Sequence, residues 1–502
     1  MKPRTPQPLL TDLYQLTMAH GYWKTGRADD EAVFNLFFRK APFGGGYTVA
    51  CGLMPALEYL ESFRYQPDDL AYLATLTGND GERLFEPAFL DYLAGLRLNL
   101  TVHAMVEGTV VFPHEPLLRI QGPIIQCQLL ETALLNIVNF DTLVATKAAR
   151  VALAAQGDPV LEFGLRRAQG PDGALSASRA AYVGGCAGTS NVLAGKMFGI
   201  PVRGTHAHSW VMSFDSELEA FRAYAEVMPN NCVFLVDTYD TLEGVRNAIA
   251  VGKILRERGK ELVGIRLDSG DLAWLSVQAR KMLDEAGFPG AIIAASNDLD
   301  EALIHSLKVE GAAITSWGVG TRLSTAYDQP ALGGVYKLAA VRRQGRWAYR
   351  VKLSEQAVKI SNPGIQQVRR FSDGREFLAD AIYDETIGAQ RQGGDGCTIV
   401  DPMDPTRQKT IAPGTAGEDL LVPVFRGDRS VYTPPSLAAS RARTFAQLSM
   451  FHPGIKRLVN PHQYPVGLER RLHHLRTDLI MSARRSAAAG REEGSGAMMA
   501  TA

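Results

Sequence analysis

The chain has few cysteines, no net charge and no long hydrophobic run, and each of these absences excludes a class of protein. Its five cysteines show no Cys-x-x-Cys spacing, which argues against a structural zinc site or a disulfide framework and fits a reducing compartment. Lys+Arg and Asp+Glu both number 53 without a long basic tract, so we expect neither nucleic acid nor an anionic membrane as a partner. No run approaches the ~18 apolar residues of a membrane span, and the first residues lack the apolar core of a secretory signal. These features indicate a cytoplasmic protein.

The middle of the chain contains six short apolar stretches, rich in β-branched residues, that each end in polar residues. A length of 502 residues with 46% hydrophobic residues is enough for a large core and for two or three domains. Because the stretches recur every ~20–40 residues and most precede helix-like sequence, they predict an α/β fold with a parallel barrel, whose functional groups gather at the carboxyl ends of its strands. The stretches are residues 159–166, 201–208, 232–237, 262–268, 291–297 and 312–320.

The segments on either side of the barrel mix amphipathic helices with strands. Residues 11–20 begin with Thr and Asp as helices often do, whereas residues 32–38 and the pair 334–341 and 346–353 alternate as strands do. Each flank is poor in core residues for its length, so we expect the two to pack together as one α+β domain. The predicted divisions are an N-terminal segment 1–147, the barrel 148–333, C-terminal strands 334–445, a helical region 446–485 and a disordered tail 486–502.

The strongest chemical signal is the sequence RLDSGD at residues 266–271. Arg266 and Asp268 lie two apart at a strand end and so point to the same side, while Ser269 and Gly270 can turn the chain into a helix with free backbone amides. The cation suits an anionic ring substituent, the carboxylate suits a sugar diol, and the backbone amides suit a phosphate. A structural salt bridge is the alternative. The position among five other polar-ended strands favours a binding site.

Two further stretches suggest contacts with a phosphate and with a ring. Gly318 and Gly320 end a late strand and leave backbone N–H groups open to a phosphate, with Ser296 and Asn297 on the preceding strand. Phe163 could belong to the core, but beside arginines it could stack on a planar ring whose negative charge they offset. The ligand inferred from these residues is aromatic, anionic and attached to a phosphorylated sugar.

His206 and His208 lie two apart and would face the same way in an extended segment. A metal pair is one interpretation, but no further ligands are evident from the spacing, so a metal site is not favoured. A histidine at a strand end is usually a hydrogen-bonded structural residue. In a mouth lined by phosphate-binding groups, a neutral imidazole can instead be a nucleophile that accepts a phosphoryl group.

Several of these motifs together resemble nicotinate phosphoribosyltransferases, in the same order from Thr11 to about Arg370. The resemblance implies a type II phosphoribosyltransferase with an irregular α/β barrel, a second domain from both flanks, and a homodimer with active sites at the subunit interface. It implies that nicotinate and 5-phosphoribosyl 1-diphosphate give nicotinate mononucleotide and pyrophosphate, the first step of NAD salvage from nicotinate, with coupled ATP hydrolysis and Mg²⁺ on the diphosphate. The motifs are TDLYQLTM (11–18), EFGLRRAQGPDG (162–173), SNVLAG (190–195), GTHAHS (204–209), RLDSGD (266–271) and GVGT (318–321).

The resemblance also implies roles for single residues. His208 matches the family's phosphorylated histidine, and His206 occupies the variable place before it. Tyr14 and Phe163 match the aromatic residues that sandwich the pyridine ring, with Tyr14 reaching in from the partner subunit. Nicotinate contacts are expected from Thr205 and Arg266, and a ribose contact from Asp268. Phosphate contacts are expected from Arg166, Ser296, Asn297, Gly318, Gly320 and Thr321, and diphosphate contacts from Lys337 and Arg39. Ser269 and Gly270 are expected to bind the substrate through the backbone amides described above.

Two positions bear on the substrate and on ATP. Related nicotinamide enzymes place a carboxylate near Ser190, where it accepts from an amide but repels a carboxylate, so Ser190 and Asn191 favour nicotinate here. The family pattern has a lysine soon after Pro-Gly, where this chain has Ile365 and Gln366, which predicts weaker binding of ATP or of the diphosphate. The alternatives are a nicotinamide phosphoribosyltransferase, a catalytically silent nucleotide-binding barrel, and quinolinate phosphoribosyltransferase, which needs neither ATP nor the histidine motif.

Overall fold

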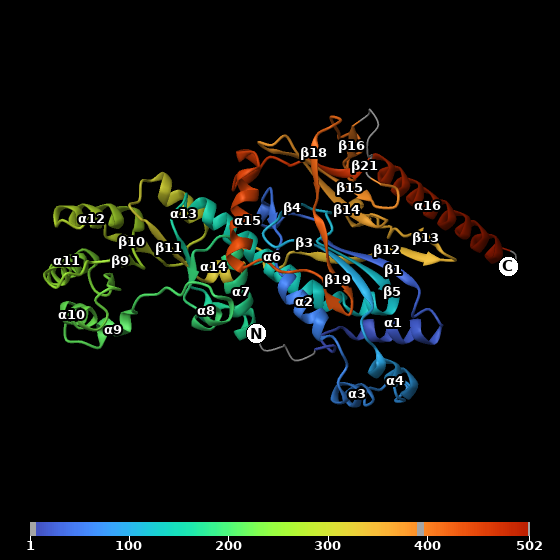
Figure 1. Cartoon of the computed structure of the whole chain (residues 1–502), viewed down its shortest axis with the longest axis horizontal. Coiled ribbons are helices and arrows are strands. Elements are labelled where there is room, and N and C mark those ends of the chain that lie inside the picture. Colours follow the sequence, from blue (N-terminus) through green and yellow to red (C-terminus); the bar gives the residue numbers. More distant parts are fainter. Residues whose placement is uncertain (1–6, 389–395, 500–502) are drawn as a thin grey trace.

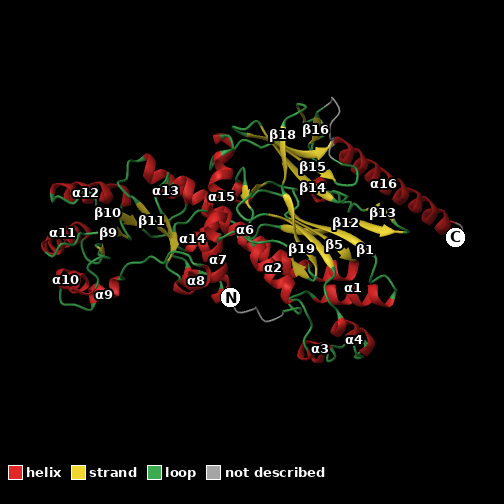
Figure 2. Cartoon of the chain, viewed as in Figure 1, coloured by secondary structure: helices red, strands yellow, loops and turns green. Residues whose placement is uncertain are grey.

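The computed structural model describes residues 7–388 and 396–499, which form a barrel lobe and a larger sheet-rich lobe (Figure 1). Figure 2 shows helices surrounding short strands in the first lobe and extended sheets in the second. None of the described helices is long and apolar enough to cross a membrane. The α-helices are α1 (Leu13–Lys24), α2 (Leu53–Ser62), α3 (Pro67–Leu73), α4 (Pro87–Gly95), α5 (Ile124–Leu129), α6 (Glu131–Ala154), α7 (Gly170–Gly184), α8 (Val192–Phe198), α9 (His208–Met212), α10 (Glu217–Val227), α11 (Thr241–Glu257), α12 (Leu272–Glu285), α13 (Glu301–Val309), α14 (Thr321–Ser324), α15 (Leu437–Ser449) and α16 (Arg470–Met499).

The barrel lobe contains a six-stranded parallel sheet in the order β7-β6-β11-β10-β9-β8. Helices α8, α11, α12 and α13 each begin with an Asn or Asp whose side chain accepts the N–H of the third helical residue: Asn191, Asp240, Asp271 and Asp300. These caps lie just beyond the carboxyl ends of strands, so polar side chains collect at that end of the sheet. The strands are β6 (Val160–Glu162), β7 (Gly188–Thr189), β8 (Val233–Leu235), β9 (Gly264–Leu267), β10 (Ile292–Ala295) and β11 (Ser316–Val319).

Beyond β7, the edge of the sheet is met by a segment, residues 202–206, that forms no regular strand. An isolated parallel bridge joins Thr189 of β7 to Val202, and Arg203 N–H donates to Thr189 O at 2.9 Å. On the far side of this segment, β8 is hydrogen-bonded as a ladder to β9 alone. The expected α/β fold is therefore confirmed. The structure is compatible with a parallel barrel, but its hydrogen-bonded sheet stays open between residues 202–206 and β8.

The second lobe joins both flanks of the chain in a seven-stranded antiparallel sheet, in the order β13-β12-β1-β5-β3-β19-β20. Strand β1 lies inside this sheet, where Asn35 is opposite Lys337 of β12 on one side and Arg119 of β5 on the other. The expectation that the two flanks build one α+β domain is thereby confirmed. The strands are β1 (Glu31–Phe38), β3 (Leu100–Met105), β5 (Leu118–Pro123), β12 (Gly334–Arg343), β13 (Arg346–Tyr349), β19 (Leu421–Gly427) and β20 (Arg429–Ser430).

A further six-stranded sheet, in the order β17-β16-β21-β15-β14-β18, is built wholly from the C-terminal flank. We expect these strands to pack with the N-terminal segment. In the structure they form a separate sheet, which contacts β5 through the Arg119 side chain, and this side chain donates to Gln366 O at 2.7 Å. A small pair, β2 (Thr48–Val49) with β4 (Val110–Val111), completes the strands. The remaining bounds are β14 (Gln366–Ser372), β15 (Phe377–Asp384), β16 (Cys397–Val400), β17 (Gln408–Ile411), β18 (Ala416–Asp419) and β21 (Val466–Glu469).

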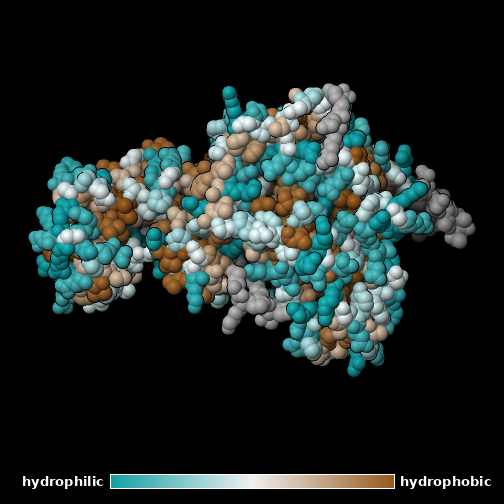
Figure 3. All heavy atoms as spheres, in the orientation of Figure 1, coloured by the Kyte–Doolittle hydropathy of each residue, from teal (hydrophilic) through white to brown (hydrophobic). Residues whose placement is uncertain are grey.

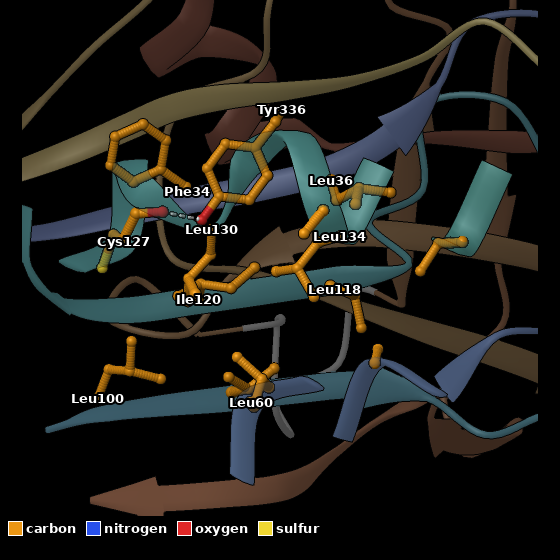
Figure 4. Packing of buried hydrophobic residues seen from close by; sticks show 14 of the residues in the cluster. Phe34, Leu36, Leu60, Leu100, Leu118, Ile120, Cys127, Leu130, Leu134 and Tyr336 are labelled. Carbon is orange, nitrogen blue, oxygen red and sulfur yellow. Dashed lines mark hydrogen bonds between the residues drawn. The ribbon is translucent and has the colours of Figure 1, made fainter. Parts of the chain in front are cut away.

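The core of the second lobe lies between the seven-stranded sheet and helices α2, α5 and α6. Figure 4 shows aliphatic side chains of β1, β3 and β5 meeting those of the helices. Tyr336 stacks on Phe34 with ring centroids 5.0 Å apart, and its hydroxyl donates to Cys127 O at 2.7 Å. This bond supplies the partner that a buried hydroxyl requires. All five cysteines are free and buried.

The predicted tail, residues 486–502, lies at the end of the last helix of the described chain. Helix α16 starts at Arg470 and continues to Met499, and it extends away from the second lobe in Figure 1. The last three residues lie outside the described part of the chain.

Candidate active site

Three side chains converge on Arg266 at the carboxyl end of β9. Its Nε donates to Ser296 Oγ at 2.8 Å, one terminal nitrogen donates to Thr205 Oγ1 at 3.0 Å, and the other donates to Asp268 Oδ1 at 3.0 Å. Ser296 Oγ also donates to Asp268 Oδ1. The Arg266 side chain remains 16% exposed. A guanidinium fixed at three points and still open to solvent is a preformed partner for a carboxylate.

The Phe163 ring lies beside this guanidinium, with Arg266 Cζ 5.9 Å from the ring centroid. Phe163 follows β6, and its N–H donates to Val319 O at 2.8 Å. Glycine at position 318 makes room for the ring, because a Cβ there would lie 2.7 Å from ring atoms Cδ2 and Cε2. An aromatic face next to a held cation suits a planar anionic ring.

His208 begins α9 and faces a buried carboxylate. Its Nε2 lies 3.2 Å from Asp237 Oδ1, where the Asp237 side chain is 1% exposed and that of His208 is 39% exposed. Asp237 Oδ2 accepts from Asp268 N at 2.9 Å and from Ser269 Oγ at 2.6 Å. An ionised carboxylate only accepts, so Nε2 of His208 carries the proton, and in the neutral imidazole the lone pair is then on Nδ1.

His206 does not form a metal pair with His208. Its ring is buried and its Nε2 accepts from Leu235 N at 3.3 Å, whereas His208 faces Asp237. Burial lowers the pKa of His206 to about 4. Within the described part of the chain, no group of three or more His, Cys, Asp or Glu residues could hold a metal ion.

A buried carboxylate at the end of β6 organises the neighbouring loop. Glu162 accepts from Gly164 N through one oxygen, and through the other from Ser178 Oγ at 2.8 Å and Thr189 Oγ1 at 2.6 Å. Asn191 donates to Ser178 Oγ at 3.1 Å and caps α8. Ser190 is the position expected to distinguish nicotinate from nicotinamide. It lies between Thr189, at the end of β7, and Asn191.

Five of the expected phosphate contacts lie at the ends of β10 and β11, namely Ser296, Asn297, Gly318, Gly320 and Thr321. Asn297 has a left-handed backbone with φ 92°, and such strain in a residue other than glycine is typical of binding sites. Gly320 leads from β11 into α14, while Arg166 follows β6 and is exposed. The residues that the structure places at the carboxyl ends of this one sheet are Phe163, Arg166, Thr205, His208, Arg266, Asp268, Ser269, Gly270, Ser296, Asn297, Gly318, Gly320 and Thr321.

Three predicted residues lie elsewhere, in the second lobe of the same chain (Figure 1). Tyr14 is on α1 and 47% exposed, and burial together with Glu131 raises its pKa. Lys337 is on β12, its Nζ donates to Tyr336 O at 2.8 Å, and burial lowers its pKa. Arg39 follows β1, and burial lowers its pKa as well. One copy of the chain does not bring these three to the barrel mouth.

Two buried carboxylates were not among the predicted site residues. Asp237 ends one of the six polar-ended stretches, so a signal was present, but nothing in the sequence shows that it faces His208 across the sheet. Glu162 lies in a recognised motif, and its role depends on Ser178 and Thr189, which follow it by 16 and 27 residues.

The positions after Pro-Gly that depart from the family pattern are both buried. Ile365 is 6% exposed and packs with Val33 and Ala340, and Gln366 is 1% exposed with its amide donating to Asn362 O at 2.8 Å. Neither position is open to a ligand in this structure.

Comparison with known proteins identifies the family. Profiles for the nicotinate phosphoribosyltransferase N-terminal domain, family and C-terminal domain match residues 9–139, 159–364 and 365–476. Nicotinate phosphoribosyltransferase of Bacillus subtilis is 44% identical over 465 residues, 92% of each chain, and the human protein is 38% identical over 93% of this chain and 96% of that one. The crystal structure of human nicotinic acid phosphoribosyltransferase superposes with a TM-score of 0.81 and 36% identity, over 93% of this chain and 99% of that one. These matches confirm the resemblance predicted from the motifs, and the chain belongs to the nicotinate phosphoribosyltransferase family.

Proposed function

We propose that this chain transfers the 5-phosphoribosyl group from 5-phosphoribosyl 1-diphosphate to nicotinate and releases pyrophosphate. The observation that carries the proposal is the Arg266 guanidinium, held by Thr205 and Ser296 beside the Phe163 ring, because this pair suits a pyridine ring with a carboxylate. The bond from ribose C1 to the diphosphate oxygen breaks, and a bond from the pyridine nitrogen to C1 forms. No general base is needed, because that nitrogen already has a lone pair.

Asp268 and the strand-end backbone would hold the rest of the donor substrate. Asp268 Oδ1 accepts from both Arg266 and Ser296, which fixes its carboxylate at the centre of the mouth. We assign its other oxygen to the ribose hydroxyls. The 5-phosphate would bind near Asn297, Gly318 and Gly320, where backbone N–H groups can approach closely. The positive charge that develops on the ribose as the diphosphate leaves is stabilised by the Asp268 carboxylate.

ATP coupling is the second part of the proposal. His208 Nδ1 would attack the γ-phosphorus of ATP, forming a P–N bond as the bond to the bridging oxygen breaks and ADP leaves. Asp237, at 3.2 Å from Nε2, supports this because it holds the imidazole tautomer that frees Nδ1. Water would later cleave the P–N bond and release phosphate. The charge of the phosphohistidine would favour release of pyrophosphate between these steps.

Mg²⁺ is expected to accompany the diphosphate and ATP. The described residues offer no cage of three or more metal-ligating side chains, and Mg²⁺ usually binds through one or two carboxylates together with substrate phosphates and water. Asp268, 28% exposed at the mouth, fits such a partial donor set. When bound, the cation would neutralise charge on the leaving diphosphate.

The separation of Tyr14, Arg39 and Lys337 from the barrel mouth supports a homodimer with shared sites. We propose that these residues of one subunit complete the mouth of the other, with Tyr14 facing Phe163 across the pyridine ring. Exposed apolar side chains are available for such a contact, and Figure 3 shows hydrophobic atoms at the surface near the junction of the two lobes. Independently of that view, the exposed apolar side chains of α1 and α8 are Leu13, Met18, Val192, Leu193 and Met197.

We further propose a cytoplasmic location. Its support is the five free cysteines, all buried, which a reducing compartment would preserve.

The test is formation of mononucleotide from either nicotinate or nicotinamide, with 5-phosphoribosyl 1-diphosphate and Mg²⁺, in the presence and absence of ATP. We expect product from nicotinate but not from nicotinamide. ATP should stimulate product formation by the wild type and should not stimulate product formation by His208→Ala. Product from nicotinamide would refute the assignment of Ser190, and no product from either base would favour a silent barrel. Mixing His208→Ala with Tyr14→Ala tests the shared site, because mixed dimers regain one intact site.

A further inference from the structure

One side chain spans the gap in the parallel sheet. His206 belongs to the segment that pairs with β7 through Val202, and its Nε2 accepts the N–H of Leu235 in β8 at 3.3 Å. The next N–H along, that of Val236, points the other way and donates to Arg266 O of β9 at 3.2 Å. Successive N–H groups of a strand point to opposite sides of that strand, so Leu235 N–H points away from β9, toward the open edge of the sheet. His206 therefore takes the place that a backbone carbonyl takes in a continuous ladder.

The surroundings of His206 keep its ring neutral and fix its tautomer. The residue is 8% exposed, and its ring lies 5.9 Å from that of Phe221, 5.0 Å from that of Tyr224 and 6.2 Å from that of Phe234. Burial lowers its pKa to about 4, and Nδ1 lies 3.4 Å from Ala207 O. A ring nitrogen that accepts cannot carry the proton, so the proton is on Nδ1.

The residues on both sides of His206 belong to the candidate active site. Thr205 accepts from Arg266 at 3.0 Å, and His208 faces Asp237 at 3.2 Å, just beyond the end of β8. The loop is thus attached to β8 and β9 through residues 205, 206 and 208. Only three peptide bonds separate Thr205 from His208, so a shift of His206 away from Leu235 acts on both residues through a short segment.

We propose that His206 is a positioning residue: by accepting Leu235 N–H it closes the sheet and holds Thr205 against Arg266 and His208 against Asp237. It contacts no reacting atom, and it acts through Thr205 and His208. The kinetic part of this inference rests on the proposed function. The structural part, an imidazole acceptor for a strand N–H, does not depend on any activity.

The experiment compares His206→Gln with His206→Leu. Glutamine Oε1 is the same number of bonds from Cβ as histidine Nε2, so it can accept from Leu235, whereas leucine fills the space without an acceptor. Phe221→Leu is the matched control, because it loosens the same aromatic cluster and leaves the acceptor in place. The readouts are amide hydrogen exchange of the peptide containing Leu235, thermal unfolding, and KM and kcat for nicotinate.

We expect faster exchange of the Leu235 peptide and a KM for nicotinate raised about tenfold in His206→Leu, the size of effect of one lost hydrogen bond. His206→Gln should stay within about threefold of the wild type in both readouts, and Phe221→Leu should lower the unfolding temperature without raising KM. Equal KM values and exchange rates in the wild type, His206→Gln and His206→Leu would overturn the inference, and so would equal loss in both variants. If His206→Leu does not fold, His206→Asn replaces it, since its shorter amide cannot reach Leu235. An inactive wild type would refute the proposed function, and the exchange result would still decide the acceptor role.

Discussion

Asp237→Asn tests the link between the buried carboxylate and His208. The asparagine amide has one acceptor oxygen, and two donors already point at Asp237 Oδ2, namely Asp268 N at 2.9 Å and Ser269 Oγ at 2.6 Å. The side chain is therefore expected to keep its oxygen there and to turn its NH₂ toward His208. His208 Nε2 must then accept, which moves the ring proton to Nδ1 and blocks the nitrogen that we assign to phosphorylation.

The size of the loss follows from the contact that is replaced. A hydrogen bond to a charged group contributes about 1.5–3 kcal/mol, which corresponds to a factor of about 10–150 in rate. The change of tautomer adds to this, since the same exchange in the Ser-His-Asp arrangement of serine proteases lowers kcat by ~10⁴. We expect labelling of His208 to fall at least about 100-fold. Because Asp237 is 1% exposed, solvent cannot replace its contact.

The assay follows transfer of labelled γ-phosphate from ATP to the protein, with an alkaline quench that preserves phosphohistidine. Asp240→Asn is the matched control, because Asp240 caps α11 three residues away and asparagine caps helices equally well. Thermal unfolding of both variants establishes that they fold. Wild-type labelling of Asp237→Asn, or an equal loss in Asp240→Asn, would refute the reasoning.

Three further predictions concern the ring, the substrate and pH. Gly318→Ala places a Cβ 2.7 Å from the Phe163 ring, so KM for nicotinate should rise about tenfold or more. Gly173→Ala is the control, because a Cβ there meets no atom within 4 Å and KM should stay unchanged. Steady-state kinetics of both variants checks this prediction. Ser190→Asp should weaken nicotinate more than nicotinamide by charge repulsion, measured as the ratio of kcat/KM values for the two bases. Buried neutral histidines should make the protein less stable in acid, because their folded pKa of about 4 lies below the unfolded value of 6.5. Their contribution to the free energy of unfolding is complete above pH 6.5 and is lost as the pH falls toward 4. Urea unfolding at pH 7, 6, 5 and 4 measures this loss of stability, and His206→Gln should show a smaller decline, of the order of 3 kcal/mol less by pH 4. The histidines concerned are His103, His114 and His206.

The sequence predicted those parts of the fold and site that depend on local geometry. Arg266 and Asp268 point to one side because they lie two residues apart at a strand end. In the structure a terminal nitrogen of Arg266 donates to Asp268 Oδ1 at 3.0 Å. Gly318 and Phe163 come from different motifs, yet the parallel order of β6 and β11 brings them together, as strand-end clustering predicts. The polar ends of the strands were informative because parallel strands share one carboxyl edge.

Contacts between distant segments could not be predicted in the same way. The pairing of Asp237 with His208 and of His206 with Leu235 depends on the order of strands and on side-chain direction, neither of which the spacing contains. The separate C-terminal sheet depends on which of several alternating strands pair. Tyr14, Arg39 and Lys337 remain predicted site residues whose place at the mouth requires a second subunit.

The order in which the strands of the seven-stranded sheet appear has a consequence for synthesis of the chain. Ala32 of β1 is opposite Val341 of β12, and β3 is bordered by β19. At typical translation speeds, β12 leaves the ribosome about 15–60 s after β1. The barrel lobe, continuous in sequence, can fold during this interval, whereas the β1–β5–β3 sheet waits with both edges unpaired. Nascent chains should therefore engage chaperones through the N-terminal strands until the C-terminal flank arrives.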